Sequence, residues 1–202
     1  RTVLEGIKHL IIGGGAIDDG LANELKHFPN NVWSTYGMTE TLSHIALRRL
    51  NGDNASDWYT PFDQVHIRLS EEGTLVIHAP EVCAEELTTN DIAEINEKGE
   101  FRILGRKDNV INSGGIKIQI EQVEALLKPH LSTPFLITST SDAKFGEAVV
   151  LLYEKGNEEE LQSLCKAALP PYWMPKRFVQ VKAIPLTETG KPNRPAARIL
   201  AR

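Results

Sequence analysis

The feature that most constrains the fold is a strand–glycine–helix–strand pattern near the start of the sequence. An apolar run at residues 9–12 ends in the triplet Gly13-Gly14-Gly15, and residues 32–36 have the composition of a second strand. Between them lie apolar residues at helical spacing with an acidic N-cap, namely Leu21, Leu25 and Phe28 with Asp18 or Asp19. Two strands that are connected by a helix run parallel to each other, because a helix needs a crossover connection and does not fit into a hairpin turn. The pattern predicts an α/β unit whose ligands gather at equivalent strand ends.

The middle of the chain, from about residue 44 to residue 104, predicts antiparallel β structure. Apolar and polar residues alternate over 65–69 and again over 75–77, on either side of a turn sequence. A second alternating pair, 92–95 and 101–104, is divided by another short polar turn. Alternation of this kind is typical of hairpins in which one face of the sheet covers a core.

The last hundred or so residues predict a compact α+β domain. Strands are expected at 116–120, 135–140 and 148–153, where apolar residues alternate or form short runs. Helices are expected at 121–127 and 158–169. The inward-facing residues would be Val123, Leu126 and Leu127 in the first helix and Leu161, Leu164, Cys165 and Ala168 in the second. The chain therefore combines α/β and α+β structure.

Composition excludes several classes of function. The net charge of −5 and the pI near 5.7 argue against a surface for nucleic acid or anionic lipid. No apolar run approaches the roughly 20 residues of a membrane span, and the first residues lack a signal-peptide layout. Cys83 and Cys165 form no CxxC pair, and the six histidines lack metal-ligand spacing. We therefore expect a reduced, cytoplasmic protein without a structural metal.

Two motifs follow the ends of the first two strands. The stretch from Gly13 to Ile17 would let a ligand approach the backbone beside a helix N-terminus, although a tight strand–helix turn explains it better. Tyr36-Gly37-Met38-Thr39-Glu40 brings together an aromatic ring, a turn glycine, a hydroxyl and a carboxylate. A nucleotide site needs such groups for stacking, close approach, phosphate binding and Mg²⁺. An ordinary first turn of a helix is the equal alternative for Thr39-Glu40.

Two further motifs lie in the second half of the chain. Arg106 offers a donor fork suited to ribose or phosphate oxygens, and Gly114-Gly115 permits close approach of a ligand between two β segments. A charged interdomain linker followed by a hairpin turn explains the hinge position equally well, but it does not explain Gly114-Gly115 followed at once by a strand. Farther on, Gly190 precedes Lys191 in a loop, and its positive charge could stabilise the charge that develops in phosphoryl substitution. Taken alone, a solvated lysine in a turn is the commoner case.

In this order and spacing, the four motifs resemble the adenylate-forming superfamily, which includes acyl-CoA synthetases, firefly luciferase and nonribosomal adenylation domains. The resemblance covers essentially the whole chain. It implies an AMP-forming acid–thiol ligase that uses ATP, Mg²⁺ and coenzyme A with a small carboxylic acid. It also implies that residues 1–105 are the C-terminal part of a large AMP-binding domain, and that 106–202 form a mobile small C-terminal domain.

The resemblance implies roles around the nucleotide. Three small residues would line the adenine and acyl pocket: Gly14, Gly15 and Ala16. Tyr36, followed by Gly37, would stack on adenine, Thr39 would meet phosphate, and Glu40 would bind Mg²⁺.

Further roles follow along the chain. Thr89-Asn90-Asp91 is similar to the superfamily's Thr-Gly-Asp, so Asp91 would hold the ribose hydroxyls, with Asn90 in place of the usual glycine. Arg106 would also contact ribose, and Asp108 matches the hinge about which the small domain rotates. The turn Gly114-Gly115 would line the pantetheine channel, and Lys191 matches the lysine of the adenylation step.

Within the superfamily, residues 36–50 are most similar to o-succinylbenzoate–CoA ligases of menaquinone biosynthesis. Ser43, His44 and Arg48 are polar groups just past the adenylate site that could serve a substrate with two carboxylates. On an alternating strand, however, Arg48 and Arg49 would point to opposite faces. Strand residues without a ligand are the equal alternative.

The superfamily's Ser/Thr/Gly-rich phosphate loop precedes all these motifs and is absent from the sequence. The chain also lacks an initiator methionine, so we expect it to begin downstream of that loop inside a longer protein, and to be inactive in isolation. Two alternatives stay open: an adenylation domain that loads a carrier protein, and a non-catalytic fragment that binds nucleotide. A Rossmann dehydrogenase would leave Lys191 and Asp108 without a role. A homodimer is also left open.

Overall fold

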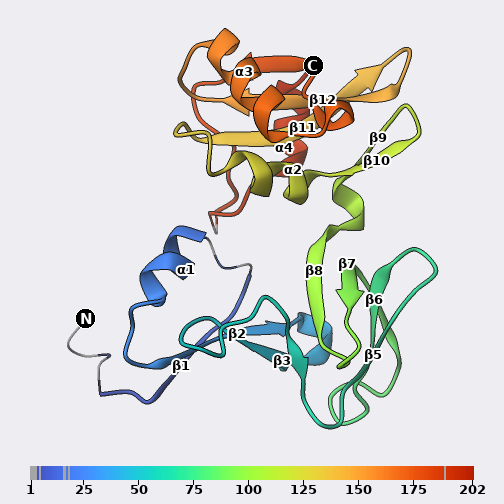
Figure 1. Ribbon diagram of the computed structural model, residues 1–202. Helices are drawn as coiled ribbons and strands as arrows, with labels where there is room; N and C mark the ends of the chain where they lie inside the picture. The colour runs from blue at the N-terminus through green and yellow to red at the C-terminus, as the bar shows by residue number, and fades with distance from the viewer. Residues whose placement is uncertain (1–3, 5, 16, 18, 189) are drawn as a thin grey trace. The chain divides into compact units, whose positions relative to one another are not determined.

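The computed structural model describes residues 4, 6–15, 17, 19–188 and 190–202. The chain divides into two compact units, Arg1–Ile103 and Leu104–Arg202 (Figure 1). Each unit has its own buried core, so each is described by itself.

The first sheet of unit 1 has the predicted parallel pair at one side. Its order is β1 (His9–Ile12), β2 (Asn31–Gly37), β3 (His44–Arg49) and β4 (Thr60–Pro61). β1 and β2 run parallel, with Ile12 opposite Ser34, and helix α1 (Asp19–Leu25) lies between them in sequence (Figure 1). Leu25 and Val32 are buried together in the small core of this pair. The parallel pairing places the ends of β1 and β2 at the same edge of the sheet.

The second sheet of unit 1 confirms both predicted hairpins. Its order is β5 (His66–Leu69), β6 (Thr74–His78), β7 (Leu87–Ile95) and β8 (Phe101–Arg106). Leu75, Ile77 and Phe101 are fully buried and share one core cluster with Ile45 of β3. The two sheets are also joined by an isolated antiparallel bridge between Tyr59 and Phe101.

Unit 2 is a five-stranded sheet with helices on both faces. The sheet order is β10 (Ile116–Gln119), β9 (Val110–Ser113), β12 (Gly146–Tyr153) and β11 (Phe135–Asp142), and β13 (Arg177–Gln180) pairs with β12 in parallel. The helices are α2 (Ile120–Leu127), α3 (Glu158–Ala168) and α4 (Arg194–Leu200). Unit 2 also has short 3₁₀ turns at Lys107–Asn109 and Pro171–Trp173, and unit 1 has one at Thr39–Thr41.

The central strand β12 and the edge strand β11 of unit 2 divide their side chains between two cores. Ile137, Val149 and Leu151 join the core formed with α2 and α3. Leu136, Val150 and Leu152 join the core formed with Ala197 of α4. Because successive side chains of a strand point to opposite faces, the continuous apolar runs of β11 and β12 are needed to bury both faces.

Four sequence predictions about local structure need correction. The strand expected at 116–120 ends at Gln119, and Ile120 begins α2. Leu126 is 42% exposed rather than inward-facing, because it lies about 100° around the helix from buried Leu127. In unit 1, Asp19 is the first residue of α1 rather than its N-cap, and Phe28 lies beyond the helix while still packing on its core. Asp18, the other N-cap candidate, lies outside the described residues.

Cys165 of α3 is fully buried, and this burial raises the pKa of its thiol to about 11. Cys83 is partly exposed, and both cysteines are free. At pH 8 the Cys165 thiol stays protonated, and only the thiolate reacts as a nucleophile. We therefore expect a disulfide-exchange reagent to titrate one thiol per chain in the folded protein and two in denaturant. Two fast-reacting thiols in the folded protein would contradict the burial of Cys165.

None of the helices in the described part of the chain combines the length and the apolar character needed to cross a membrane.

Candidate functional site

The centre of the candidate site in unit 1 is a hydrogen bond between Tyr36 and Asp91. The Tyr36 hydroxyl donates to Oδ2 of Asp91 over 2.6 Å and joins β2 to β7, two strands that are 55 residues apart in sequence. The Tyr36 ring packs edge-on against Phe101 at 5.1 Å and tilted against Tyr59 at 5.9 Å. The packed rings hold Tyr36 in place, and its hydrogen bond in turn fixes the position of the Asp91 carboxylate.

Asp91 lies in β7 where its pairing with β6 shifts register, because Thr74 pairs with Ile92 and Val76 with Thr88. The Asp91 amide donates to the hydroxyl oxygen of buried Thr89 over 3.1 Å, and Thr89, Asn90 and Asp91 all belong to β7. Among the described residues, Leu42 is the only non-glycine residue with a positive φ. Asn90 therefore needs none of glycine's conformational freedom, and its presence here leaves the position of the Asp91 carboxylate unaffected.

The segment after β2 turns sharply around Gly37. A Cβ atom on Gly37 would lie 2.5 Å from the carbonyl oxygen of Ser43 and 2.7 Å from Cα of His44. The buried hydroxyl of Thr41 closes the turn, because it donates to the Ser43 carbonyl over 2.6 Å and accepts from the Met38 amide over 3.1 Å. The turn therefore requires the absence of a side chain at residue 37, and it leaves Thr39 and Glu40 exposed.

Replacing Gly37 by alanine should destabilise unit 1 by about 1–3 kcal/mol, because the added methyl group meets backbone atoms that cannot move independently. Urea unfolding followed by circular dichroism would measure the loss. Gly6→Ala is the matched control, because a Cβ atom there meets nothing within 4 Å. Equal stability of the two variants would show that the turn relaxes around the methyl group.

The glycine triplet comes close to the same edge of the sheet. Ile12 pairs with Ser34, and a Cβ atom on Gly13 would lie 2.7 Å from the Thr35 hydroxyl oxygen. Gly13 therefore lies beside Thr35, the residue that precedes Tyr36 in β2. Gly14 and Gly15 are exposed, and Ala16 lies outside the described residues. The edge therefore presents two adjacent exposed backbone segments, as the βαβ pattern indicated.

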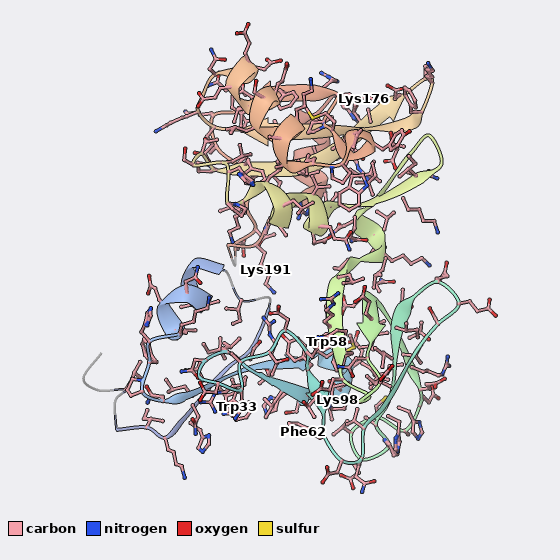
Figure 2. The ribbon with its side chains drawn as sticks, in the orientation of Figure 1. Trp33, Trp58, Phe62, Lys98, Lys176 and Lys191 are labelled. Atoms are coloured by element: carbon pink, nitrogen blue, oxygen red, sulfur yellow. The ribbon has the colours of Figure 1, made fainter. Side chains whose placement is uncertain are left out.

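Two further candidate residues, Ser43 and His44, are exposed, and the His44 ring lies 6.3 Å from that of Phe62. Arg48 lies over the Tyr59 ring at 5.1 Å and contacts Asp57, whereas Arg49 lies over the Trp33 ring at 5.2 Å. The two arginines thus contact different aromatic residues. Figure 2 labels Trp33, which Arg49 contacts, and Phe62, which lies near His44.

Within the described ranges, no group of three or more His, Cys, Asp or Glu side chains is arranged to hold a metal ion. Glu40 could therefore contribute one ligand to an ion that is held mainly by other groups. Mg²⁺ bound to a substrate phosphate is such an ion, because it keeps several waters and takes only one or two carboxylates.

In unit 2, the segment after β8 is attached to the start of α2. The side-chain amide of Gln119 donates to the Arg106 carbonyl over 2.9 Å and to the Glu121 carboxylate over 2.6 Å. Exposed Arg106 and Asp108 face each other at 3.7 Å in the 3₁₀ turn region. This ion pair is weak, because both partners are solvated, so the backbone near Asp108 is held by Gln119 rather than by charge.

Gly114 and Gly115 form a two-residue hairpin turn between β9 and β10. Ser113 pairs with Ile116 across it, and φ is +60° at Gly114 and +84° at Gly115. Positive φ at both central residues is the requirement of a type I′ turn, which suits strand twist and favours glycine. A hairpin turn therefore does account for this glycine pair followed at once by a strand, contrary to the sequence prediction, and the turn is exposed.

Lys191 lies in a loop closed by its own backbone. The Thr187 amide donates to the Lys191 carbonyl over 2.7 Å, and the Lys191 amide donates to the Thr187 hydroxyl over 3.1 Å. Leu186 and Pro192 form an isolated bridge across the loop. The Lys191 side chain is exposed (Figure 2), and its own backbone is held by the two hydrogen bonds to Thr187.

Arg194, which the sequence interpretation missed, attaches this loop to the sheet and to α2. Its guanidinium donates to both carboxylate oxygens of Glu124, over 2.6 and 2.7 Å, and to the Ile137 carbonyl over 2.9 Å. Burial disfavours the charged guanidinium, but hydrogen bonding and charge attraction from Glu124 outweigh it and raise the pKa of Arg194. Its position three residues after Lys191 was the available signal, but the partner is 70 residues away.

Comparison with known proteins identifies related sequences. A family model described as the AMP-binding enzyme C-terminal domain matches residues 138–191. The chain is 27% identical over 223 residues to 2-succinylbenzoate–CoA ligase of Bacillus cereus, and the match covers 95% of this chain and 46% of that protein. It is 25% identical over 230 residues to a plipastatin synthase of Bacillus subtilis, with 92% of this chain and 9% of that protein covered.

The fold is also similar to solved structures. The o-succinylbenzoate CoA synthetase of Bacillus subtilis, in complex with its acyl-adenylate intermediate, matches with a TM-score of 0.77 and 23% identity, over 95% of this chain and 46% of that one. At this identity the likeness establishes the fold. The chain spans about half the length of the ligases that it matches.

Proposed function

Because the chain is, in sequence and in fold, the C-terminal portion of an adenylate-forming enzyme, we propose that it serves an ATP-dependent carboxylate–CoA ligase. The reaction would proceed through an acyl-adenylate, with o-succinylbenzoate as the acid and menaquinone biosynthesis as the pathway. The observation that carries the proposal is the Tyr36–Asp91 hydrogen bond. It brings Tyr36 and Asp91, which belong to two motifs and are 55 residues apart in sequence, into direct contact, and this contact supports assigning both motifs to one nucleotide site.

The proposed nucleotide site uses the exposed edge of unit 1. Asp91, held by Tyr36, would accept hydrogen bonds from the ribose hydroxyls, since each carboxylate oxygen has two lone pairs. Tyr36 would offer ring surface to adenine, and exposed Thr39 would donate to phosphate. Three small residues would let the nucleotide approach the backbone: Gly14, Gly15 and Ala16. Glu40 would hold Mg²⁺, which neutralises phosphate charge when bound.

Unit 2 would supply groups to the two steps in turn. In the first step the substrate carboxylate attacks the α-phosphorus of ATP, and Lys191 stabilises the added negative charge as pyrophosphate leaves. In the second step the thiolate of coenzyme A attacks the acyl carbon and AMP leaves with its electron pair. We propose rotation near Asp108 between the steps, with Arg106 near ribose and Gly114-Gly115 lining the pantetheine channel. Each conformation would assemble a different site.

The choice of acid rests on the similarity to 2-succinylbenzoate–CoA ligase. Exposed Ser43 and His44 are proposed to contact the substrate. A cytoplasmic location is proposed as well, supported by two free cysteines. The isolated chain is proposed to be inactive, and a homodimer stays a prediction that light scattering would test.

A carrier-protein-loading adenylation domain is the second candidate function. The match to the plipastatin synthase covers 92% of this chain and only 9% of that protein, so the same stretch occurs inside a much larger polypeptide. The acceptor decides between the two functions. A ligase transfers the acyl group to free coenzyme A, whereas a loading domain transfers it only to a phosphopantetheinylated carrier.

The decisive experiment offers a panel of acids to the longest natural polypeptide that contains this sequence. The proposal expects o-succinylbenzoate to release pyrophosphate and to form a thioester with free coenzyme A, ahead of aryl and fatty acids. Calorimetry on the 202-residue chain tests nucleotide binding directly, with Asp91→Asn as the variant that should weaken it. Nucleotide binding without pyrophosphate release from any acid would favour a non-catalytic fragment.

A further inference from the structure

The Gly114-Gly115 turn is held from outside its own hairpin by Phe145. Phe145 lies in the loop between β11 and β12, and its carbonyl accepts a hydrogen bond from the Gly114 amide over 2.8 Å. A Cβ atom on Gly114 would lie 3.0 Å from Cδ1 of the Phe145 ring. Residue 114 is therefore constrained both by its positive φ and by the adjoining ring.

Phe145 is in turn fixed by charged groups around it. The ammonium of Lys176 lies 2.9 Å from the centroid of the Phe145 ring, and that of Lys144 lies 5.3 Å away (Figure 2 labels Lys176). The Asp142 carboxylate accepts from the amides of Phe145 and Lys144, each over 2.9 Å, and these bonds lower the pKa of Asp142. A cation over the face of an aromatic ring is attracted by the negative charge density of that face.

These contacts fix the position of the Gly114-Gly115 turn, and they contribute little to the buried cores of unit 2. Phe145 belongs to none of the buried core clusters of the described residues, and its side chain is only partly buried. Lys176 is exposed and lies in another segment of the chain, immediately before β13. Two separate segments thus support one two-residue turn that contributes little to the core, since the β11–β12 loop contacts the turn and Lys176 contacts Phe145 of that loop.

We propose that Phe145, secured by Lys176, is a positioning residue that sets the Gly114-Gly115 turn for transfer of the acyl group to the thiol. The inference rests on the proposed function, in which this turn lines the pantetheine channel. It assigns Phe145 no part in acyl-adenylate formation, because the first step relies on the separately held Lys191 loop. A loosened turn admits more thiol orientations, and misplacement of about 1 Å can cost up to 100-fold in rate.

The test measures the two half-reactions separately in the longest natural polypeptide with this sequence. Phe145→Leu removes the ring face, and Lys176→Met removes the cation while keeping the chain length. Lys144→Met is the matched control, because its ammonium lies farther from the ring. We expect about a tenfold loss in kcat for thioester formation from supplied acyl-adenylate with Phe145→Leu, and a smaller loss with Lys176→Met. Acyl-adenylate formation should stay within about twofold in all three variants.

Hydrogen exchange on the 202-residue chain supplies a readout that is independent of activity. The Gly114 amide should exchange faster in Phe145→Leu and Lys176→Met, and at the parental rate in Lys144→Met. Equal losses in both half-reactions, or no loss in thioester formation, would overturn the inference. So would a higher KM for coenzyme A with unchanged kcat and unchanged exchange, because this pattern marks direct ligand contact.

The same data separate failure of this inference from failure of the proposed function. A parental protein that forms acyl-adenylate but never transfers it to coenzyme A overturns both. A parental protein that completes both steps, with variants that complete both at the parental rates, overturns only the role of Phe145.

Discussion

Lys191→Ala should reduce acyl-adenylate formation about 10²–10³-fold while leaving thioester formation from supplied acyl-adenylate nearly unchanged. The exposed ammonium is the group that the closed Thr187–Lys191 loop presents, and its charge acts only while negative charge develops on the phosphate. Pyrophosphate release reports the first step, and thioester yield from synthetic acyl-adenylate reports the second.

Lys182→Ala is the control for loss of an exposed lysine in the same unit, and it should leave both steps at the parental rate. Equal loss of both half-reactions in Lys191→Ala would contradict the role proposed for this side chain. Loss of adenylation in both lysine variants would point to a general effect of charge on unit 2.

Arg194→Met should destabilise unit 2 by about 2–3 kcal/mol, because it leaves the Glu124 carboxylate without its bidentate partner. This value is below that of a fully buried pair, since both side chains are 21% exposed. Hydrogen exchange read by mass spectrometry would measure the loss in the peptides of unit 2. Acyl-adenylate formation should fall as well, because the Lys191 loop loses its attachment to α2.

Arg198→Met provides the matched control for an arginine in the same helix. Its contact with Glu147 is 3.7 Å long, and the two side chains are 54% and 31% exposed. Such a pair contributes about 0–1 kcal/mol, so the variant should stay close to the parental stability. If both arginine variants lost the same stability, the Glu124 pair would have no special importance.

Most strands could be predicted because their signal is local. Alternation located β5, β6 and β10, a continuous apolar run located β12, and the glycine triplet located the parallel pair β1 and β2. The helix α4 was missed because its seven residues offer less than two turns of periodicity and begin with Arg194-Pro195. Leu126 was wrongly predicted to be buried, because it is apolar and adjoins the buried residues of α2 in sequence.

The side-chain contacts of the candidate site could not be predicted. Resemblance assigned Tyr36 and Asp91 to one ligand, but the hydrogen bond between them depends on how two sheets pack. Glu124 looks like an ordinary polar position of an amphipathic helix, and nothing near it in sequence indicates Arg194. Pairs of high sequence separation are specified by the whole fold rather than by local pattern. The assigned roles of the site residues stay predictions.

The Glu124–Arg194 pair also has a consequence for the order in which unit 2 becomes native. Its partners are 70 residues apart, so the contact forms only after a long segment has been organised, and non-local contacts of this kind form slowly. The Glu124 carboxylate also accepts from the Ile137 amide over 2.9 Å, so it can join α2 to β11 earlier. During refolding, the sheet should therefore gain exchange protection first, and the Lys191 loop should be among the last segments to do so.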